Sequence, residues 1–297
     1  MGNYIGIDLG GTSVKFGIIS ASGEILKQWN IPTVQGQIVE DIVASIRENA
    51  DLSEIEGIGM GSPGVINYET GTVKGAYNLG WADETPVKEI IERELQKTTI
   101  IENDANVAAL GEQWVGAGEN ADNVVLVTLG TGVGGGVIVG GQLQRGVAGA
   151  AGEIGHMCVE IDGYECTCGN RGCLEQYAAA TGLTNIARHY GYAAQFETAK
   201  EIMDAAQKLN PNALEIVAKF ASSLGLALAN IANILNPSYI VIGGGVSAAG
   251  DYLIQIVEAH FREHAYPGVK HTTKLRIAQL GNDAGILGAA RLAGAGK

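Results

Sequence analysis

Three cysteines and one histidine form the most specific chemical pattern in the sequence. Cys166, Cys168 and Cys173 stand in a short loop punctuated by glycine, and His156 precedes the first of them by ten residues. Three thiolates and an imidazole complete a tetrahedral Zn²⁺ shell and leave no open position for catalysis. The alternative is a loop of reduced cysteines without metal, because C-x-C is a rarer metal spacing than C-x₂-C. Cys158 lies outside this pattern, and we expect it to be a small core residue.

Two glycine-rich turns are candidates for phosphate binding. One follows Asp8 and ends at Thr12, and the other runs over residues 130–136; a strand-like run precedes and follows each turn. The backbone N–H groups of such turns can bind phosphate oxygens. Asp8 could hold Mg²⁺ through water, and Thr12 and Thr131 could donate their hydroxyls. Either turn alone could be a plain hairpin, but the two together favour phosphate binding.

The second turn also satisfies a dinucleotide-binding pattern in form only. Gly130, Gly132 and Gly135 match G-x-G-x-x-G, but that site needs a helix after the turn to hold the pyrophosphate. Here a strand-like run follows at residues 137–139, which excludes a Rossmann site. The sequence G-x-x-x-x-G-K-[ST] does not occur either, so a P-loop enzyme is also excluded.

A carboxylate that could act as a base stands between an apolar run and a helical pattern. Residues 100–106 read Ile-Ile-Glu-Asn-Asp-Ala-Asn, and the helical pattern follows them. Asn103 or Asp104 at this place could simply be the N-cap of the helix. Asp104 could equally be a general base that takes the proton of a substrate hydroxyl. The residues by themselves leave both interpretations open.

The elements that must position these groups alternate between strands and helices. Apolar runs predict strands at 4–7, 14–19, 124–129, 137–139 and 239–242, the last leading into Gly243-Gly244-Gly245 and a helical pattern from Ser247 onward. Apolar residues at three-to-four spacing predict helices at 39–49, 86–96, 106–114, 174–190, 198–208 and 212–235. This alternation predicts α/β layers, and the repeated strand–turn–strand unit predicts two related halves that face a common cleft.

Composition and charge narrow the class of protein. The 297 residues suffice for two ordinary domains, and the 44 glycines are the one anomaly of composition. A net charge of −13 has the wrong sign for binding nucleic-acid phosphates, so no nucleic-acid partner is expected. The first apolar run contains Asp8, unlike a signal peptide, and the most apolar later stretch, 224–235, is too short to span a bilayer. We therefore expect a cytoplasmic protein without a membrane partner, in which clustered cysteines suggest metal before disulfides.

These residues together resemble a known family. The Asp8–Thr12 turn, the Gly-Thr-Gly turn and Gly243-Gly244-Gly245 look like the phosphate and adenosine loops of the actin/hexokinase/Hsp70 ATPases. Within that superfamily the chain resembles the ROK sugar kinases over nearly its whole length, most specifically at residues 166–175. The resemblance implies an α/β, actin-like ATPase (ribonuclease H-like) fold with two domains around a cleft. The expected domains are 1–115 plus about 281–297, and a larger one at 116–280 that carries the zinc loop.

The resemblance also implies roles for individual residues. Asp104 would be the general base for the sugar hydroxyl. His156 would use one ring nitrogen for zinc and the other for the sugar. For Glu153 the alternative is an exposed loop carboxylate. The implied hexose contacts are Gly64, Asn78, Asn103, Asp104, Glu153, His156 and Glu175; the implied ATP and Mg²⁺ contacts are Asp8, Gly10, Gly11, Thr12, Lys15, Thr131, Gly132, Gly244 and Gly245; the implied structural Zn²⁺ ligands are His156, Cys166, Cys168 and Cys173.

The expected reaction is phosphorylation of a hexose by ATP, with glucose O6 as the acceptor, because residues 168–177 look most like those of bacterial glucokinases. Kinases for N-acetylmannosamine, allose or fructose share most of these residues and remain alternatives. A ROK sugar-sensing transcriptional regulator is a rival of another class, but such proteins carry a helix-turn-helix before the first phosphate loop, which here starts at Asp8. A filament or chaperone ATPase would not need the cysteine cluster. A homo-oligomer, dimer or tetramer, is expected from the same resemblance.

Overall fold

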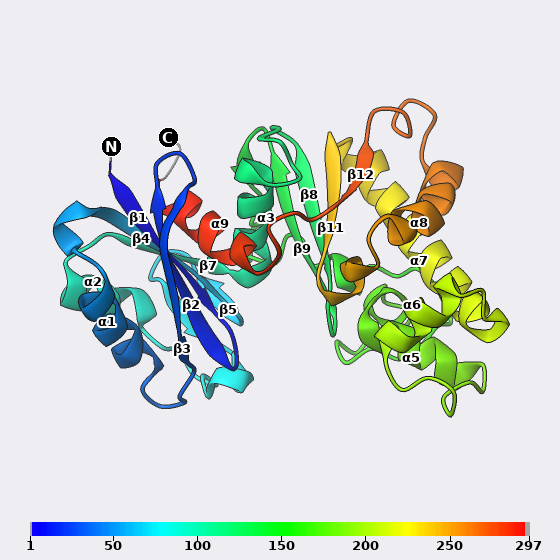
Figure 1. Ribbon diagram of the computed structural model, residues 1–297, viewed down its shortest axis with the longest axis horizontal. Helices are drawn as coiled ribbons and strands as arrows, with labels where there is room; N and C mark the ends of the chain where they lie inside the picture. Colours follow the sequence, from blue (N-terminus) through cyan, green and yellow to red (C-terminus); the bar gives the residue numbers. More distant parts are fainter. Residues whose placement is uncertain (1, 295–297) are drawn as a thin grey trace. The chain divides into compact units, whose positions relative to one another are not determined.

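The computed structural model describes residues 2–294, which form two compact units, each built on a five-stranded sheet (Figure 1). Unit 1 comprises residues 2–120, 145–151 and 282–294, and unit 2 comprises residues 121–144 and 152–281. The segment Arg145–Ala151, called loop 145–151 below, therefore belongs to unit 1 although the chain on both sides of it belongs to unit 2. The domain boundaries near 115 and 280 stay a prediction.

The sheet of unit 1 has the strand order β3-β2-β1-β4-β7. Strands β1, β2 and β3 are antiparallel neighbours, whereas β4 and β7 run parallel to β1. The bounds are β1 Asn3–Leu9, β2 Ser13–Ser20, β3 Ile25–Pro32, β4 Ile55–Ser62 and β7 Thr99–Asn103. A small two-stranded sheet, β5 (Val65–Asn67) and β6 (Thr72–Lys74), lies between β4 and β7 in the chain.

The sheet of unit 2 repeats this plan with the order β10-β9-β8-β11-β12. Strands β8, β9 and β10 are antiparallel neighbours, and β11 and β12 run parallel to β8. The bounds are β8 Val124–Leu129, β9 Val133–Val139, β10 Gln142–Leu143, β11 Tyr239–Gly243 and β12 Lys274–Ile277. The α/β class and the duplicated strand–turn–strand unit that the sequence predicts are confirmed.

Glycines allow a helix to lie directly on the first sheet. A Cβ atom on Gly6 of β1 would lie 1.8 Å from the carbonyl oxygen of Ile286, and one on Gly59 of β4 would lie 1.8 Å from that of Ala289. Both oxygens belong to α9 (Ala284–Ala293), so only residues without a side chain permit this contact. The other helices of the unit are α1 (Ile38–Asn49), α2 (Val87–Leu95) and α3 (Asp104–Val115), with the 3₁₀ turns Leu52–Glu54, Tyr77–Leu79 and Gly281–Asp283 (the last assigned in part to unit 2).

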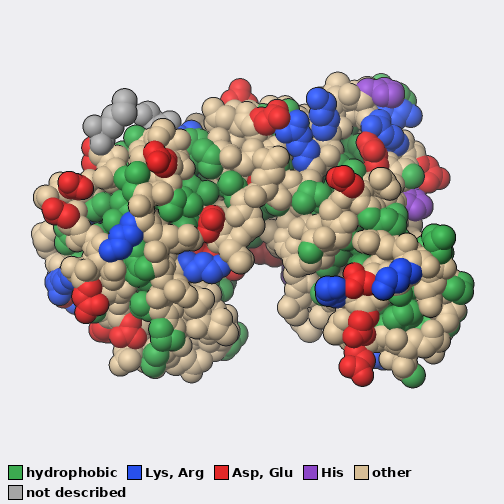
Figure 2. Space-filling view, viewed as in Figure 1, with side chains coloured by type: hydrophobic (Ala, Val, Ile, Leu, Met, Phe, Trp, Pro, Cys, Tyr) green, Lys and Arg blue, Asp and Glu red, His purple; other side chains and the backbone are tan. Residues whose placement is uncertain are grey.

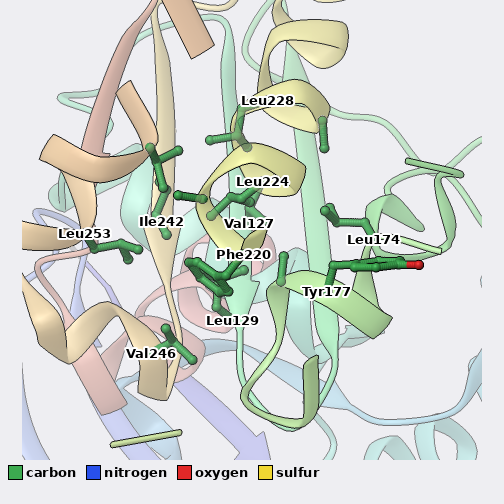
Figure 3. Packing of buried hydrophobic residues seen from close by; sticks show 14 of the residues in the cluster. Val127, Leu129, Leu174, Tyr177, Phe220, Leu224, Leu228, Ile242, Val246 and Leu253 are labelled. Carbon is green, nitrogen blue, oxygen red and sulfur yellow. The ribbon is translucent and has the colours of Figure 1, made fainter. Parts of the chain in front are cut away.

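Helix α7 (Pro211–Leu235) forms the centre of the core of unit 2 (Figure 3). Phe220, Leu224 and Leu228 from α7 pack with Val127 and Leu129 of β8, and all five side chains are buried. Helix α7 is the one helix of the described chain that is long and apolar enough to cross a membrane, but 61% of its most apolar window is buried inside the fold, as in a core helix. The remaining helices are α4 (Glu175–Ala178), α5 (Ala180–His189), α6 (Ala199–Gln207) and α8 (Asp251–His264).

The surface drawn in Figure 2 mixes acidic and basic side chains. Basic and histidine side chains gather at the upper right, over the region of α8 and β12, while acidic side chains are scattered over both units. On the face drawn in Figure 2, the acidic side chains therefore form no single large patch.

The structure corrects four local expectations. The helix expected over 174–190 is broken at Ala179, whose extended backbone (φ −97°, ψ 177°) separates α4 from α5. The second glycine turn is shorter than expected, because residues 134–136 pair with β8 inside β9. The helical pattern from Ser247 begins as a 3₁₀ turn, Gly245–Ala249, before α8. Cys158 is an exposed free cysteine and not a core residue, although its backbone forms an isolated β-bridge with that of the buried Cys173.

Candidate active site and metal centre

Three neighbouring parallel strands of unit 1 end at the same edge of the sheet. The register pairs Asp8 of β1 with Gly61 of β4, and Ser62 of β4 with Asn103 of β7. Asp104 follows at once as the first residue of α3. The Asp8 and Asp104 carboxylates, 96 positions apart in the sequence, are thereby placed at one edge, as expected for the carboxyl ends of parallel strands.

The Asp8 carboxylate lies in a partly desolvated position. Burial raises the pKa of Asp8 above its ordinary value, the nearby Lys15 opposes this shift, and the negative charge of Asp104 adds to it. Lys15 Nζ lies 3.9 Å from Asp8 Oδ2, because the two residues are paired across the β1–β2 hairpin. A carboxylate of this kind gains from a cation beside it, so Asp8 fits the predicted role at Mg²⁺.

In the structure Asn103, and not Asp104, is the N-cap of α3. The side-chain oxygen of Asn103 accepts hydrogen bonds from the backbone N–H groups of Ala105 (3.0 Å) and Asn106 (3.3 Å), so Asn103 is the N-cap of α3. Asp104 is exposed, and one oxygen of its carboxylate also accepts from the Ala105 N–H at 2.8 Å. Its second oxygen, Oδ2, makes no hydrogen bond within the described residues 2–294, so it can accept a proton.

The first glycine turn brings two of the expected sugar and phosphate residues together. The Gly10 N–H donates to the Ser13 carbonyl at 3.0 Å, which closes the turn between β1 and β2. A Cβ on Gly11 would lie 3.1 Å from Asn78 Nδ2, so the side chain of Asn78 lies beside the turn.

Gly64, another expected sugar contact, has a φ of +96°, and a Cβ there would lie 2.7 Å from a backbone oxygen, so glycine is needed at that position.

The second glycine turn, Gly130–Gly132 in unit 2, is held by two neighbouring segments. The Thr131 carbonyl accepts from the Thr181 hydroxyl at 2.6 Å, which ties the turn to the start of α5. The Glu175 carboxylate accepts from the Val133 N–H at 3.1 Å, and a Cβ on Gly132 would lie 2.1 Å from Glu175 Oε2. Glu175, an expected sugar contact, therefore lies directly beside the turn expected to bind phosphate.

The third glycine segment lies next to this turn and opens onto a cavity. Gly244 has a φ of +83°, and a Cβ there would lie 2.5 Å from the backbone of Leu129, the last residue of β8. A cavity of about 560 Å³ begins at Gly245 and suits a ligand of nucleotide size. Its other walls come from the start of α5, from α6 with its N-cap, and from the 3₁₀ turn before α8. They are formed by Ala180, Thr198, Ala199, Lys200, Met203, Asp204, Gln207, Val246, Ala248 and Ala249.

The His156, Cys166, Cys168 and Cys173 side chains converge in one loop of unit 2, and their ligand atoms all lie within 4.8 Å of one another. The sulfur atoms of Cys168 and Cys173 are 3.7 Å apart, and Cys166 Sγ is 3.7 Å from His156 Nδ1. Sulfurs bound to one tetrahedral Zn²⁺ at about 2.3 Å would lie about 3.8 Å apart. The donor set and its spacing therefore fit a tetrahedral metal ion.

The thiols of this cluster differ in how readily they ionise. Burial opposes ionisation of Cys166, but hydrogen bonds from Cys168, Cys173 and His156 outweigh it and lower the pKa of Cys166 to about 7. Burial and the neighbouring thiols raise the pKa of Cys173 to about 12. His156 turns Nδ1 to the thiols and Nε2 toward the Glu153 carboxylate, 3.8 Å away. The Glu153 side chain is 67% exposed, so the loop-carboxylate alternative stays open for it.

Sequence reasoning missed two parts of the site. The residues of α6 that line the cavity carry no signal other than helical periodicity, because only the fold brings them opposite Gly245. Glu102, which is completely buried, was passed over although a carboxylate at the end of the apolar run 100–101 is a visible exception to the strand pattern.

Comparison with known proteins identifies the family of the chain. The model of the ROK family matches residues 4–295. A glucokinase from Halalkalibacterium halodurans is 43% identical, over 96% of this chain and 93% of the relative. The crystal structure of a ROK family glucokinase from Streptomyces griseus in complex with glucose and AMPPNP has a TM-score of 0.78 and 35% identity, covering 98% of this chain and 99% of that one. A putative xylose repressor from Caldicellulosiruptor sp. is 32% identical, over 97% of this chain and 77% of the relative. The chain belongs to the ROK family and has its actin-like ATPase fold.

Proposed function

We propose that this protein transfers the γ-phosphoryl group of ATP to the 6-hydroxyl of glucose. The observation that carries the proposal is the placement of Asp104 at the sheet edge that also holds Asp8, with the capping of α3 left to Asn103. A glucokinase 43% identical to this chain, and a glucokinase structure that contains both glucose and a nucleotide, support it.

In the proposed reaction the Asp104 carboxylate accepts the proton of the attacking hydroxyl. Phosphoryl transfer needs mainly positioning and electrostatic stabilisation, so a base that orients the alcohol and takes its proton late is sufficient. Mg²⁺ held by Asp8 would neutralise charge on the phosphates. Lys15, Thr12 and Thr131 would bind phosphate oxygens together with those N–H groups of the Asp8–Thr12 and Gly130–Gly132 turns that do not close the turns themselves.

The cavity at Gly245 is the proposed place of the adenosine. Backbone at Gly244 and Gly245 can approach a ligand closely, and Val246 and Met203 supply apolar surface for a base. The hexose would be held by Gly64, Asn78, Asn103, Glu153, His156 and Glu175. Amides and carboxylates suit that task because they read hydroxyls in pairs and leave a buried polar group unpaired when a hydroxyl is missing.

We propose Zn²⁺ for the metal cluster, with His156, Cys166, Cys168 and Cys173 as its four ligands. Four protein ligands make the site structural, and the metal would fix the ring of His156 so that its other nitrogen is available to the sugar. A cytoplasmic location and a homo-oligomeric state, dimer or tetramer, are proposed with the same assignment.

A coupled assay of ADP release from ATP and Mg²⁺ tests the function. Glucose should give a higher kcat/KM than mannose, fructose, allose or N-acetylmannosamine. A higher kcat/KM for N-acetylmannosamine would show that glucose is not the preferred substrate, but the protein would still be a sugar kinase. Binding of glucose without any stimulation of ADP release would instead favour a sugar-sensing protein, the class to which the repressor relative belongs.

A further inference from the structure

Glu102 is a buried carboxylate that binds four donors. Its Oε1 atom accepts hydrogen bonds from the Tyr68 hydroxyl (2.8 Å), the Asn103 backbone N–H (2.9 Å) and Asn106 Nδ2 (3.0 Å). Its Oε2 atom accepts from Arg145 Nε at 2.6 Å. Glu102 is 0% exposed, whereas the Arg145 side chain is 36% exposed. All five residues belong to unit 1.

The four donors come from three separate segments. Asn103 and Asn106 belong to the turn that starts α3, Tyr68 follows β5, and Arg145 opens loop 145–151. The Arg145 guanidinium also lies over the Tyr68 ring, 5.0 Å from its centroid. A Cβ on Gly149 would lie 2.8 Å from Tyr68 Cε2, so loop 145–151 lies against Tyr68 at a second point. Glu102 is thus the only carboxylate among these contacts and joins the three segments.

Stability alone is a weak reason for this arrangement. A buried ion pair contributes little net stability compared with apolar side chains of the same volume, because both charges must be desolvated. The ion pair and its hydrogen bonds instead fix the orientation of the Glu102 side chain, since a carboxylate with four donors has one orientation that satisfies all of them. Burial, followed by the neighbouring Glu102 charge, raises the pKa of Tyr68, so its hydroxyl stays a donor to Glu102.

We propose that Glu102 is a positioning residue for Asp104, and that Arg145 acts on the reaction through Glu102. Glu102 holds the Asn103 N–H, and Asn103 in turn caps the helix whose first residue is Asp104. Loss of the Arg145 contact would release one oxygen of Glu102 and let this turn rotate. The inference rests on the proposed kinase function and assigns to Glu102 and Arg145 no contact with substrate.

Two substitutions break the ion pair between Glu102 and Arg145, one from each side. In Glu102→Gln the amide oxygen can still accept from Tyr68, Asn103 and Asn106, but its nitrogen faces Arg145, so a donor meets a donor. Arg145→Gln removes the same contact from the other side. A matched control is Arg47→Gln, which breaks another ion pair of unit 1, Arg47–Glu94 at 3.1 Å, on the exposed surface.

Each of the two variants should lower kcat for glucose about 10- to 100-fold, the loss that follows from misplacing a reacting group by a fraction of an ångström to one ångström. The KM for ATP should stay unchanged, because the cavity at Gly245 is in the other unit. The double variant should be no slower than the slower single variant, since both changes break one contact. Arg47→Gln should keep the wild-type kcat. Hydrogen exchange, which needs no turnover, should be faster in loop 145–151 and the first turn of α3 for both variants.

Three outcomes would overturn the inference. These three are kinetic: a wild-type kcat in Glu102→Gln, a double variant in which the two losses multiply, and a KM for ATP that rises as much as kcat falls, which would indicate a general loss of structure. A fourth outcome comes from hydrogen exchange. A wild-type protein that phosphorylates no hexose would instead contradict the proposed function, while unchanged hydrogen exchange in both variants would independently contradict the positioning role.

Discussion

Asn103 fills the capping role that Asp104, the next residue, would otherwise have to fill. The Asn103 side chain accepts from two N–H groups at the start of α3, and Asp104 stands exposed on the first turn. The two residues therefore have separable tasks, although the sequence allowed either one to be the cap. This separation makes the role of Asp104 open to a clean substitution.

Asp104→Asn should lower kcat on the order of 10²–10⁴-fold, because the amide cannot accept the proton of the hydroxyl. Glucose binding and thermal stability should be largely retained, since the Asn103 cap is unchanged and an amide oxygen can still accept from the Ala105 N–H. Steady-state kinetics with glucose titrations checks this. The control is Asn103→Ala, which removes the cap and should cost about 1 kcal/mol of stability. A near-normal kcat in Asp104→Asn would leave Asp104 without a catalytic role.

Asp8→Asn should stabilise the protein at neutral pH in the absence of nucleotide and Mg²⁺. Burial raises the pKa of Asp8, so the folded state binds its proton more readily than the unfolded state does. Stability then falls as pH rises from the unfolded pKa of about 3.9 through the raised folded value, and the cost is present at pH 7. Melting curves should show the variant above the wild type at pH 7, with a smaller difference below about pH 4. Equal melting temperatures at pH 7 would contradict the origin assigned to the shift. The same variant should lose kinase activity.

Gly244→Ala should weaken ATP binding and lower stability, because the new Cβ meets both an unfavourable φ of +83° and the backbone of Leu129 at 2.5 Å. Gly191→Ala is a control for a positive φ alone, since Gly191 has a φ of +80° and nothing within 4 Å of a Cβ. The control should show only the backbone cost, about 1 kcal/mol. Nucleotide titration and thermal melting of both variants measure the difference. Similar effects of the two substitutions would show that the contact with Leu129 is unimportant.

Most of the fold could be predicted from local patterns in the sequence. Apolar periodicity located α1, α2, α6 and α7 within one or two residues at each end, and the two glycine hairpins predicted the duplicated sheets. Two of the wrong predictions concern glycine and alanine. Their side chains are so small that the spacing of apolar residues says little about the secondary structure they adopt. Gly134, Gly135 and Gly136 have the composition of a turn, yet they pair with β8 as strand residues. Ala179 interrupts a continuous helical pattern through its backbone alone.

The candidate site was predictable where its residues are close in sequence. The metal-ligand set lies within eighteen positions, and residues 103–104 are adjacent, so spacing and resemblance located both. Contacts between distant segments were not predictable. Glu102 and Arg145 are 43 positions apart, and the α6 wall of the cavity meets Gly245 only through the fold. Cys158 was misjudged for the same reason, because exposure depends on what the folded loop leaves uncovered.

We expect a metal ion to hold the loop of His156 and the three ligand cysteines, and we expect its loss to weaken sugar binding more than nucleotide binding. Four protein ligands leave no open position for a catalytic hydroxide, so the metal would act by fixing the loop. Cys168→Ser should therefore reduce bound Zn²⁺ and lower glucose affinity or activity about 10- to 100-fold, the usual cost of disturbing a ligand's support. The effect should pass through His156 and through Glu175, which follows Cys173 by two positions and binds the Val133 N–H.

The structure offers a matched control for this substitution in Cys158→Ser. Cys158 is an exposed cysteine of the same loop region, and its side chain is outside the group of four converging ligands. It should keep one Zn²⁺ per chain and wild-type glucose affinity. Metal analysis of protein purified without chelator, with glucose and nucleotide titrations of both variants, measures each part. Absence of zinc from the wild type would remove the site, and a greater loss of nucleotide than of glucose affinity in Cys168→Ser would remove its proposed role. ATP affinity should change less than glucose affinity, because the cavity at Gly245 is lined by Ala180, α6 and the 3₁₀ turn before α8 and not by the cysteine loop. Any change in ATP affinity would come through Glu175, which also holds the Gly130–Gly132 turn.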